Sequence, residues 1–401
     1  MTTPPCDAVA SSSPLFNQRL PEGEYMAVTV VAVRERAPNE RRIALSPEVA
    51  KKLQALGAQV VIEAGAGSGA NQPDAIFPGV QVEADAGAAL ARADVLLTVQ
   101  PPSLETIAAL REGSIVIGFM QPHADPERIK ALRDRKITAF AMELLPRTTR
   151  AQAMDVLSSQ AGMAGYKAVL IAAELSGKFF PMLTTAAGTI RPSKVLIVGA
   201  GVAGLQAIAT ARRLGAQVEG FDVRPETREQ IESLGAKFLD LGVSAAGSGG
   251  YARELTAEER AEQQQRLADH LKNIDAVVTT AAVPGRPAPK ILTAAMVEGM
   301  KPGAVIVDLA AETGGNCELT RPGETFVHGS VTIAGPLNLP SRGAIHSSEM
   351  YARNLYNFLA LSLSDGALTL DWEDELIAQT CLTHAGAIRH EATRQKVEGA
   401  A

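Results

Sequence analysis

A Gly-x-Gly-x-x-Gly pattern stands in the middle of the chain, at Gly199, Gly201 and Gly204. A β-branched apolar run, residues 194–198, leads into it, and a helix-period run begins at Val202. In this spacing the first glycine permits a tight turn, the second lets the backbone approach a pyrophosphate, and the third lets the helix pack on the strand. The free N–H groups of the helix N-terminus, around Val202 and Ala203, face the phosphate charge. The chemistry indicated is the binding of a dinucleotide.

An acidic residue follows at the distance that such a site requires. Residues 217–222 are predicted to form a second strand that ends in Asp222, about 20 residues after the glycines. A carboxylate here accepts hydrogen bonds from the adenosine ribose and repels a 2′-phosphate, so it favours NAD over NADP. Arg224 weakens this preference, because an arginine near the acid can accommodate that phosphate. The alternative is a glycine-rich turn in an α/β protein of another kind.

The composition indicates a globular chain of two domains. Its 401 residues are too many for one ordinary domain, and 46% hydrophobic with 20% charged residues can bury substantial cores. The net charge of −6 gives no electrostatic attraction for nucleic acid. Cys6, Cys317 and Cys381 lie far apart without the paired spacing of a zinc site, so we expect reduced thiols and no metal.

Neither a targeting segment nor a membrane span is expected. The first residues lack the charged region and the continuous apolar core of a signal peptide. The most apolar stretch, residues 168–190, is interrupted by Glu174, Lys178 and Pro181. The chain itself is therefore predicted to be soluble, without direct insertion into a membrane.

Short apolar runs alternate with helix-period segments on both sides of the glycines. Strands are predicted before the glycines at residues 27–33, 59–63, 95–99, 115–119 and 138–141. Further strands are predicted after them at residues 274–280, 304–308 and 331–335. A helix is predicted over residues 46–57, with Ser46 as its N-cap. The alternation predicts an α/β fold with two doubly wound, Rossmann-like parallel-sheet domains that face each other across a cleft.

Domain boundaries are predicted from breaks in this alternation. Residues 1–24 are rich in Pro, Ser and Thr and are expected to form a disordered leader. Residues 25–165 form the first domain, and residues 347–390, which open with a helix-period run over 347–364, complete it. Residues 166–346 form the nucleotide-binding domain.

A run of small residues, 241–251, interrupts the second domain before a charged helix predicted over residues 252–272. The run ends in Gly250 and Tyr251. A glycine-rich loop of this length inside a compact domain is usually either functional or disordered. Two interpretations stay open: a solvent-exposed insertion, or a mobile lid that closes over bound nucleotide.

Three segments outside the glycine pattern resemble a known superfamily. They are RRIALSP at residues 41–47, PRTTRAQAMDVLSSQ at residues 146–160 and DLAAETGGN at residues 308–316. Together they resemble the alanine dehydrogenase and nicotinamide nucleotide transhydrogenase superfamily, over roughly residues 26–385. The RAQ-x-MD segment at residues 150–155 resembles the NAD(H)-binding component, domain I, of proton-translocating transhydrogenases.

Two glutamines distinguish between the branches of that superfamily. Alanine dehydrogenases carry a lysine and a histidine after two strands of the first domain, where these residues bind and protonate the keto acid. Here Gln100 and Gln121 stand at those places, and His123 follows two residues after the second. A neutral amide cannot serve as the proton donor or acceptor. Direct hydride transfer between two nicotinamide rings needs no such group, only alignment of the rings and exclusion of water.

The resemblance implies catalytic roles for Arg147, Gln152, Asp155 and Ser158, which would lie against the nicotinamide end of the cofactor. Gln152 would also contact NADP(H) bound to a partner, while Arg147 and Asp155 would orient the carboxamide and the ribose. Arg150 is expected among the cofactor-binding residues. The alternative is structural: Arg147 and Asp155 form an ion pair, and Ser158 caps the following helix.

The resemblance also implies cofactor contacts in the second domain. The pyrophosphate would be held by Gly199, Gly201, Val202, Ala203 and Gly204, and the adenosine by Asp222, Val223 and Arg224. The loop at Gly250 and Tyr251 resembles the mobile loop of the family. Ala281 and Ala282 would flank the nicotinamide, with Ala282 standing where a leucine is commoner.

The function implied is that of the soluble NAD(H)-binding subunit of a proton-translocating, Re/Si-specific NAD(P) transhydrogenase. Such a chain passes a hydride between its own NAD(H) and NADP(H) on a partner subunit. The resemblance implies a cytoplasmic homodimer that docks on the inner membrane through separate membrane-spanning and NADP(H)-binding subunits. The alternatives are a soluble NAD-dependent amino-acid dehydrogenase of the alanine type and an NAD-sensing module without turnover of its own.

Overall fold

The computed structural model describes three stretches of the chain, residues 27–242, 256–282 and 286–399. The leader predicted at residues 1–24 lies outside these stretches. So do Gly250 and Tyr251, whose expected contacts with the cofactor stay predictions.

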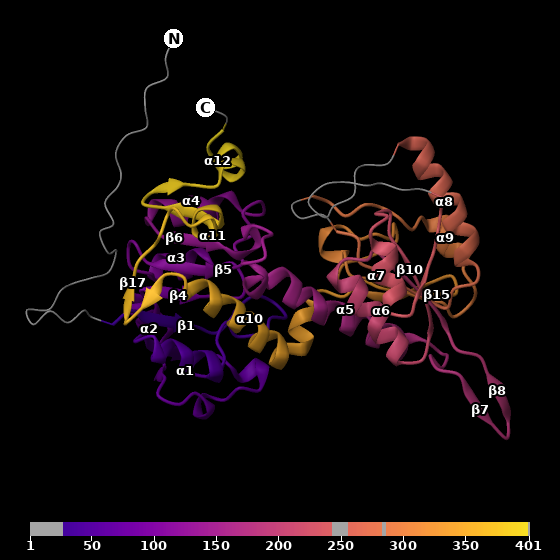
Figure 1. The fold of residues 1–401 in the computed structure, drawn as a ribbon, viewed down its shortest axis with the longest axis horizontal. Coiled ribbons are helices and arrows are strands. Elements are labelled where there is room, and N and C mark those ends of the chain that lie inside the picture. The colour runs from indigo at the N-terminus through magenta and orange to yellow at the C-terminus, as the bar shows by residue number, and fades with distance from the viewer. Residues whose placement is uncertain (1–26, 243–255, 283–285, 400–401) are drawn as a thin grey trace, which may run out of the picture. The chain divides into compact units, whose positions relative to one another are not determined.

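The described chain forms two units (Figure 1). Unit 1 runs to Leu157 and resumes at Ala344, and unit 2 consists of Ser158–Gly343. Each unit contains one large, mostly parallel sheet with a hydrophobic core on each face. The predicted fold class, two α/β domains with parallel sheets, is confirmed.

The sheet of unit 1 has eight strands in the order β19-β18-β6-β5-β4-β1-β2-β3. Their bounds are β1 (Thr29–Ala32), β2 (Gln59–Glu63), β3 (Gln81–Glu83), β4 (Val95–Leu97), β5 (Ile115–Gly118), β6 (Thr138–Ala141), β18 (Cys381–His384) and β19 (Ala387–Ile388). Strands β1 to β6 pair in parallel, whereas β18 and β19 add to the β6 edge antiparallel. In this doubly wound order, ligands bind at the carboxyl ends of β1 and β4, where the direction of winding reverses.

Helices cover both faces of this sheet. The helices of unit 1 are α1 (Pro47–Ala55), α2 (Ala86–Arg92), α3 (Leu104–Ala109), α4 (Pro126–Asp134), α10 (Ala344–Leu359), α11 (Glu375–Thr380) and α12 (Glu391–Glu398). Short 3-10 helices are η1 (Ser68–Ala70), η2 (Asp74–Ile76), η3 (Met142–Leu144) and η4 (Gln152–Met154). Because successive strand residues point to opposite faces, Val30 belongs to the same core as Leu53 of α1 and Phe358 of α10, whereas Val31 belongs to the core that contains Ile129 of α4.

The sheet of unit 2 has seven strands in the order β11-β10-β9-β12-β13-β15-β14. Their bounds are β9 (Lys194–Val198), β10 (Gln217–Phe221), β11 (Lys237–Phe238), β12 (Ala276–Thr279), β13 (Val305–Asp308), β14 (Thr325–His328) and β15 (Val331–Ala334). Only β14 is antiparallel among these described strands. The winding reverses between β9 and β12, so the carboxyl ends of these two strands mark the expected ligand site.

The helices of unit 2 include one that begins at the boundary between the units, α5 (Val156–Leu175). The others are α6 (Val202–Arg213), α7 (Thr227–Ser233), α8 (Ala257–Leu271) and α9 (Ala294–Glu298), with 3-10 helices η5 (Ala311–Thr313) and η6 (Leu339–Gly343). A separate two-stranded hairpin of β7 (Leu183–Thr185) and β8 (Gly188–Ile190) projects from the body of unit 2 (Figure 1).

N-caps set the starts of two helices. The hydroxyl of Ser46 accepts a hydrogen bond from the N–H of Val49, so α1 begins where the sequence predicts. Helix α8 begins at Ala257, five residues after the predicted start. There Thr256 and Glu259 form a capping box, in which each side chain accepts a hydrogen bond from the other residue's N–H.

The last predicted helix is shifted. It was predicted over residues 347–364, but α10 ends at Leu359 and the chain then forms the small hairpin of β16 (Leu363–Ser364) and β17 (Ala367–Leu368). Asp365 and Gly366 make its turn, with φ of 49° and 74°. An Asp-Gly pair is a strong signal for a two-residue hairpin, and here it outweighs the helical periodicity of the sequence.

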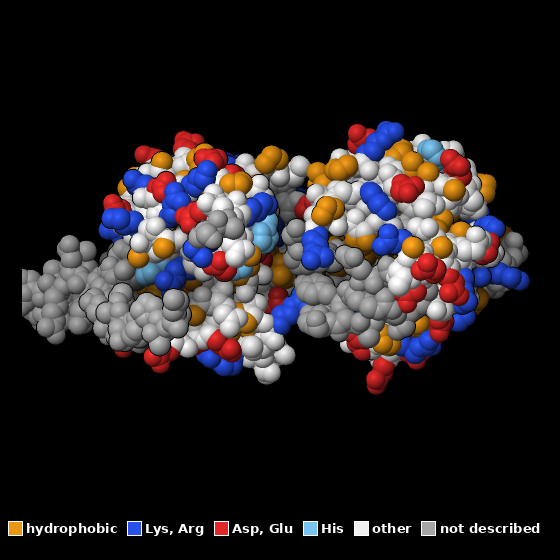
Figure 2. All heavy atoms as spheres, turned by 90° about the horizontal axis from the view of Figure 1, so that it is seen from above, with side chains coloured by type: hydrophobic (Ala, Val, Ile, Leu, Met, Phe, Trp, Pro, Cys, Tyr) orange, Lys and Arg blue, Asp and Glu red, His pale blue; other side chains and the backbone are white. Residues whose placement is uncertain are grey.

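The surface carries both signs of charge. On the face shown in Figure 2, acidic and basic side chains of the described residues are interspersed on each unit. Neither sign of charge dominates that face.

Candidate functional site

The glycine-rich turn of unit 2 links β9 to α6. Gly199 has a φ of +98°, which favours glycine. A Cβ on Gly204 would lie 1.8 Å from the carbonyl oxygen of Gly199, so α6 can pack this close to the strand only with a glycine here. A Cβ on Gly201 would meet no atom within 4 Å, and the side chain of Val202 is exposed. The turn therefore presents accessible backbone where the pyrophosphate is expected.

The first turn of α6 packs closely against α5. Ala203 is half-buried there, and a Cβ on Gly165 of α5 would lie 2.0 Å from the carbonyl oxygen of Ala203. The two helices thus approach each other closely at a glycine. This contact fixes the helix N-terminus that is expected to face the phosphates.

Asp222 follows β10 and closes onto the glycine-rich turn. Its carboxylate accepts hydrogen bonds from the N–H of Ala200 at 2.7 Å and the N–H of Arg224 at 2.9 Å. The Arg224 guanidinium donates to both carboxylate oxygens, at 2.9 and 2.8 Å. Burial acts to raise the pKa of Asp222, but these hydrogen bonds outweigh it and hold that pKa below its usual value. Asp222 is therefore ionised at neutral pH. The next residue of the loop, Val223, is half-buried.

The loop after β12 is fastened to the rest of unit 2 by side chains. The Thr279 hydroxyl donates to the buried Asp308 carboxylate at 2.9 Å. The Thr280 hydroxyl lies 3.2 Å from the carbonyl oxygen of Gly199, in the glycine-rich turn. Ala281 is half-buried and Ala282 is exposed. The structure therefore brings Ala281 to the same end of the sheet as the glycine-rich turn and Asp222.

Of the expected catalytic residues, Arg147, Gln152 and Asp155 belong to unit 1, and Ser158 is the first residue of unit 2. Gln152 is exposed and begins η4, whose Ala153 carbonyl accepts hydrogen bonds from Asn354 at 2.8 Å and Asn357 at 2.9 Å, both on α10. Met154 is buried beneath this turn. Gln152 is thus an accessible amide on a firmly held backbone.

The other members of this segment differ in their surroundings. Arg147 is exposed and Asp155 is half-buried. Ser158 is the third residue of α5, so Asp155, and not Ser158, directly precedes the helix. The guanidinium of Arg150 forms two hydrogen bonds with the Asp374 carboxylate, at 3.2 and 2.7 Å, so in this structure it serves an ion pair within unit 1.

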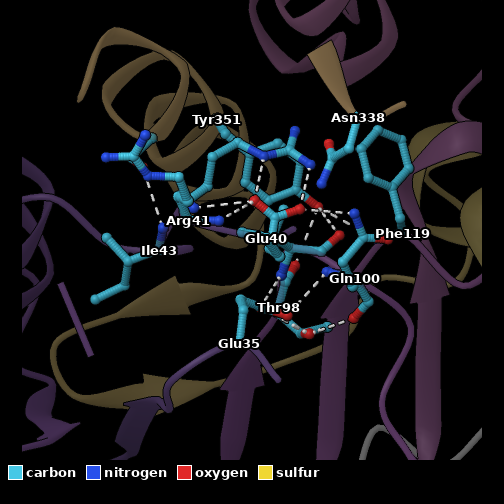
Figure 3. Close-up of polar contacts among 12 residues, drawn as sticks. Glu35, Glu40, Arg41, Ile43, Thr98, Gln100, Phe119, Asn338 and Tyr351 are labelled. Atoms are coloured by element: carbon cyan, nitrogen blue, oxygen red, sulfur yellow. Dashed lines mark hydrogen bonds and ion pairs between the residues drawn. The ribbon is translucent and has the colours of Figure 1, made fainter. Parts of the chain in front are cut away.

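A polar cluster lies where the winding of unit 1 reverses, at the carboxyl ends of β1 and β4 (Figure 3). The Glu35 carboxylate accepts hydrogen bonds from the N–H of Val99 at 2.5 Å and the N–H of Gln100 at 3.2 Å. The Gln100 amide donates to Glu40 at 2.7 Å, and the Arg42 guanidinium binds the same carboxylate at 2.6 Å. The Glu40 side chain is fully enclosed.

The pKa of Glu35 is strongly shifted in this cluster. Burial raises its pKa to about 7, against the lowering effect of the two N–H groups, and the nearby Glu40 carboxylate adds to the increase. The buried Tyr351 of α10 donates to the Thr98 carbonyl at 3.0 Å. The polar groups of the cluster therefore form hydrogen bonds with one another and with nearby backbone groups.

Gln121 lies after β5, as Gln100 lies after β4. It is exposed with a φ of +46°, and its N–H donates to Glu143 at 2.5 Å. His123 is also exposed, and its ring lies 6.3 Å from that of His390. Both strand ends of unit 1 therefore carry amides, with the neighbouring carboxylates engaged by backbone N–H groups.

Five polar residues have roles that were not predicted from the sequence: Glu35, Glu40 and Arg42 in unit 1, and Asp308 and Asn316 in unit 2. The sequence contained a hint of a role both for the residues of unit 1 and for those of unit 2. Glu35 follows the first predicted strand, and the reversal of winding next to that strand marks a ligand-binding edge. Asp308 and Asn316 belong to a segment that was singled out by resemblance alone.

Comparison with known proteins places the chain in a family. Residues 31–164 match the family described as "Alanine dehydrogenase/PNT, N-terminal domain", and residues 168–391 match "Alanine dehydrogenase/PNT, C-terminal domain". The chain is 46% identical over 372 residues to a protein of Rhodospirillum rubrum that is named as the first part of NAD(P) transhydrogenase subunit alpha. This match covers 90% of this chain and 97% of that protein.

A solved structure and a more distant relative agree with this match. The crystal structure of transhydrogenase from Sinorhizobium meliloti has a TM-score of 0.82 and 47% identity, covering 90% of this chain and 99% of that chain. The alanine dehydrogenase of Mycobacterium tuberculosis is 29% identical over 371 residues, covering 88% of this chain and 92% of that protein. Within the described residues, no helix is both long and apolar enough to cross a membrane. By sequence and by fold, the chain belongs to the alanine dehydrogenase/PNT family.

Proposed function

We propose that this chain is the NAD(H)-binding subunit of a proton-translocating NAD(P) transhydrogenase and passes a hydride between its NAD(H) and NADP(H) held by a partner subunit. Two amides, Gln100 and Gln121, follow strands β4 and β5 of unit 1. This pair of amides favours a transhydrogenase and argues against an amino-acid dehydrogenase. Reduction of an imine or keto acid needs a proton, which an amide does not supply. Hydride transfer between two nicotinamide rings needs none.

The residues of unit 2 fit a bound dinucleotide. The accessible backbone at Gly201 and Val202 would hold the pyrophosphate, and Asp222 would accept hydrogen bonds from the adenosine ribose. The nicotinamide of the cofactor supplies the carbon that gives or takes the hydride. Ala281 and Ala282 would flank that ring, and their small side chains leave room for it.

The segment from Arg147 to Ser158 would orient the nicotinamide and meet the partner. An exposed amide on a rigid turn, Gln152, suits a contact that forms only when a partner docks. Arg147, Asp155 and Ser158 would fix the carboxamide and ribose. Arg150 would contribute through its ion pair with Asp374, which anchors this segment to α11.

We infer a homodimer as well, with the β7–β8 hairpin as its contact. All six strand residues of the hairpin are exposed. Met182, Leu183 and Ile190 have exposed fractions of 65%, 37% and 45%. A two-stranded hairpin is marginal by itself in water, and its open edges favour pairing with another strand. A second copy of the same hairpin provides a self-complementary apolar partner.

The remaining subunits would be separate chains that span the membrane and bind NADP(H), so this chain would lie in the cytoplasm at the inner membrane. Such partners are supported by the similarity to a relative that is named as the first part of a transhydrogenase subunit.

The test measures hydride transfer from NADH to an oxidised NADP analogue, first with this chain alone and then with the soluble NADP(H)-binding domain of a transhydrogenase. We expect activity only in the mixture, and at least a tenfold loss in Gln152→Asn. Gln395→Asn, which shortens an exposed glutamine on α12, is the matched control and should keep full activity. Oxidation of NADH by the chain alone with pyruvate and ammonia would instead identify an amino-acid dehydrogenase.

A further inference from the structure

Asn316 is fully buried in unit 2, in the segment that follows η5. Its side-chain amide makes three hydrogen bonds, all with backbone groups. The oxygen accepts from the N–H of Ala281 at 3.0 Å, and the nitrogen donates to the carbonyl of Ala281 at 2.7 Å. The same nitrogen donates to the carbonyl of Pro289 at 2.9 Å. One side chain therefore binds both ends of the stretch between residues 281 and 289.

The backbone of Asn316 strengthens this attachment. Its carbonyl accepts hydrogen bonds from the N–H of Ile291 at 2.8 Å and the N–H of Leu292 at 3.0 Å. Leu292 also forms a parallel bridge with Cys317. The far end of the stretch is thus fixed to the same short segment that carries the Asn316 side chain.

Asp308 fastens this segment to the sheet. Its buried carboxylate accepts hydrogen bonds from the N–H of Cys317 at 3.0 Å and from the hydroxyls of Thr320 at 2.6 Å and Thr279 at 2.9 Å. The position of Asn316 is therefore defined relative to β12 and β13. The neighbouring Thr280 is held separately, because its N–H donates to the carbonyl of Val198 at 2.8 Å and its hydroxyl lies 3.2 Å from the carbonyl oxygen of Gly199.

We propose that Asn316 is a positioning residue for hydride transfer, which sets the backbone of Ala281 and through it the place of the nicotinamide ring. This proposal rests on the proposed function, in which Ala281 and Ala282 flank that ring. Asn316 acts through the loop and does not touch the cofactor itself. Misplacement of reacting atoms by about 1 Å can cost on the order of 100-fold in rate.

The amide is specific for this task, because the site requires one acceptor and two donated hydrogen bonds. An aspartate could still accept from the N–H of Ala281, but its oxygens would face the carbonyls of Ala281 and Pro289 without a hydrogen to donate. Alanine would remove all three bonds. Both variants leave the glycine-rich turn and Asp222 unchanged, so the adenosine and pyrophosphate contacts should persist.

The experiment compares Asn316→Ala and Asn316→Asp with wild type, with Ser114→Ala as the control. Ser114 is also fully buried and donates to a backbone carbonyl, that of Ala93 at 2.9 Å, but lies at the amino end of β5 in unit 1. The measurements are the Kd for NADH, the emission of bound NADH, the melting temperature, and the rate of hydride transfer in the partner mixture. We expect the Asn316 variants to lose about 100-fold in rate with a Kd within about threefold of wild type.

Two results would overturn the proposal. One is a rate within twofold of wild type in folded Asn316→Ala. The other is a loss that Ser114→Ala reproduces at an equal change in melting temperature. If the wild-type mixture transfers no hydride, the proposed function fails. The emission of bound NADH then decides whether Asn316 positions the nicotinamide ring. An altered emission of bound NADH in Asn316→Ala would then support the positioning role, and an unchanged one would refute it.

Discussion

At the scale of single residues, the glycines of the turn have separable roles. Gly204→Ala would place a Cβ 1.8 Å from the carbonyl oxygen of Gly199, so α6 must move away from β9. We expect this variant to lose about 1–3 kcal/mol of stability together with NADH binding. Gly201→Ala meets no atom within 4 Å and should keep its melting temperature while binding NADH more weakly. Thermal melting and NADH titration check both, and equal melting temperatures in the two variants would contradict the packing argument.

Glu35 makes stability depend on pH. Its pKa rises from 4.5 in the unfolded chain to about 7 in the fold, chiefly through burial. The folded state therefore binds the proton more tightly, so the stability that this group contributes is full below pH 4.5 and is lost as the pH rises through about 7. The shift corresponds to about 3 kcal/mol.

The variant Glu35→Gln removes this titration, because its amide stays neutral. Between pH 4.5 and pH 8, the unfolding free energy of the variant relative to wild type should increase by about 3 kcal/mol. Denaturant unfolding at several pH values gives both curves. Parallel curves would show that Glu35 does not titrate in this range.

Local spacing explains which site residues the sequence could reveal. Gly199, Gly204 and Asp222 lie within one strand–turn–helix–strand unit, so their relation is visible in the sequence. Glu35 instead meets Val99, and Asn316 meets Ala281, 64 and 35 positions apart. Such pairs form only when the parallel strands align, and residue spacing alone does not predict them.

At the scale of elements, the β7–β8 hairpin is the clearest test of assembly. Leu183→Asp places a charge in the apolar contact proposed for a second copy and should convert a dimer to a monomer without unfolding unit 2. Val327→Asp is the matched control, since Val327 is 64% exposed on β14, at the edge of the sheet of unit 2. Light scattering reports the mass. A Leu183→Asp variant that stays dimeric would exclude the hairpin as the contact.

Most strands of the parallel sheets were predictable because they are short buried runs of apolar residues, whereas β3 and β11, which are two or three residues long and largely exposed, were not predicted. Strand β2 matches its prediction at Gln59–Glu63, and β6 matches at Thr138–Ala141. The antiparallel additions β18 and β19 were not predicted, because they are short and directly follow the six-residue helix α11. The β7–β8 hairpin was hidden within an apolar stretch that carries no alternation of exposed and buried positions.

At the scale of the whole molecule, the alternation of strands and helices was enough to predict two doubly wound domains. Both sheets place candidate residues where the winding reverses: Glu35 and Gln100 in unit 1, Gly199 and Thr280 in unit 2. Only unit 2 combines that position with a glycine-rich turn. This difference supports a nucleotide site in unit 2 and a self-satisfied polar cluster in unit 1.

In the proposed function, the hydride passes directly from one nicotinamide to the other. The most direct measurement uses NADH with deuterium at the transferred position, oxidised NADP analogue, this chain and the NADP(H)-binding partner domain, in ordinary water. We predict that the deuterium appears quantitatively in the reduced NADP analogue. Loss of the deuterium to water, or its appearance in alanine when pyruvate and ammonia are supplied, would contradict direct transfer.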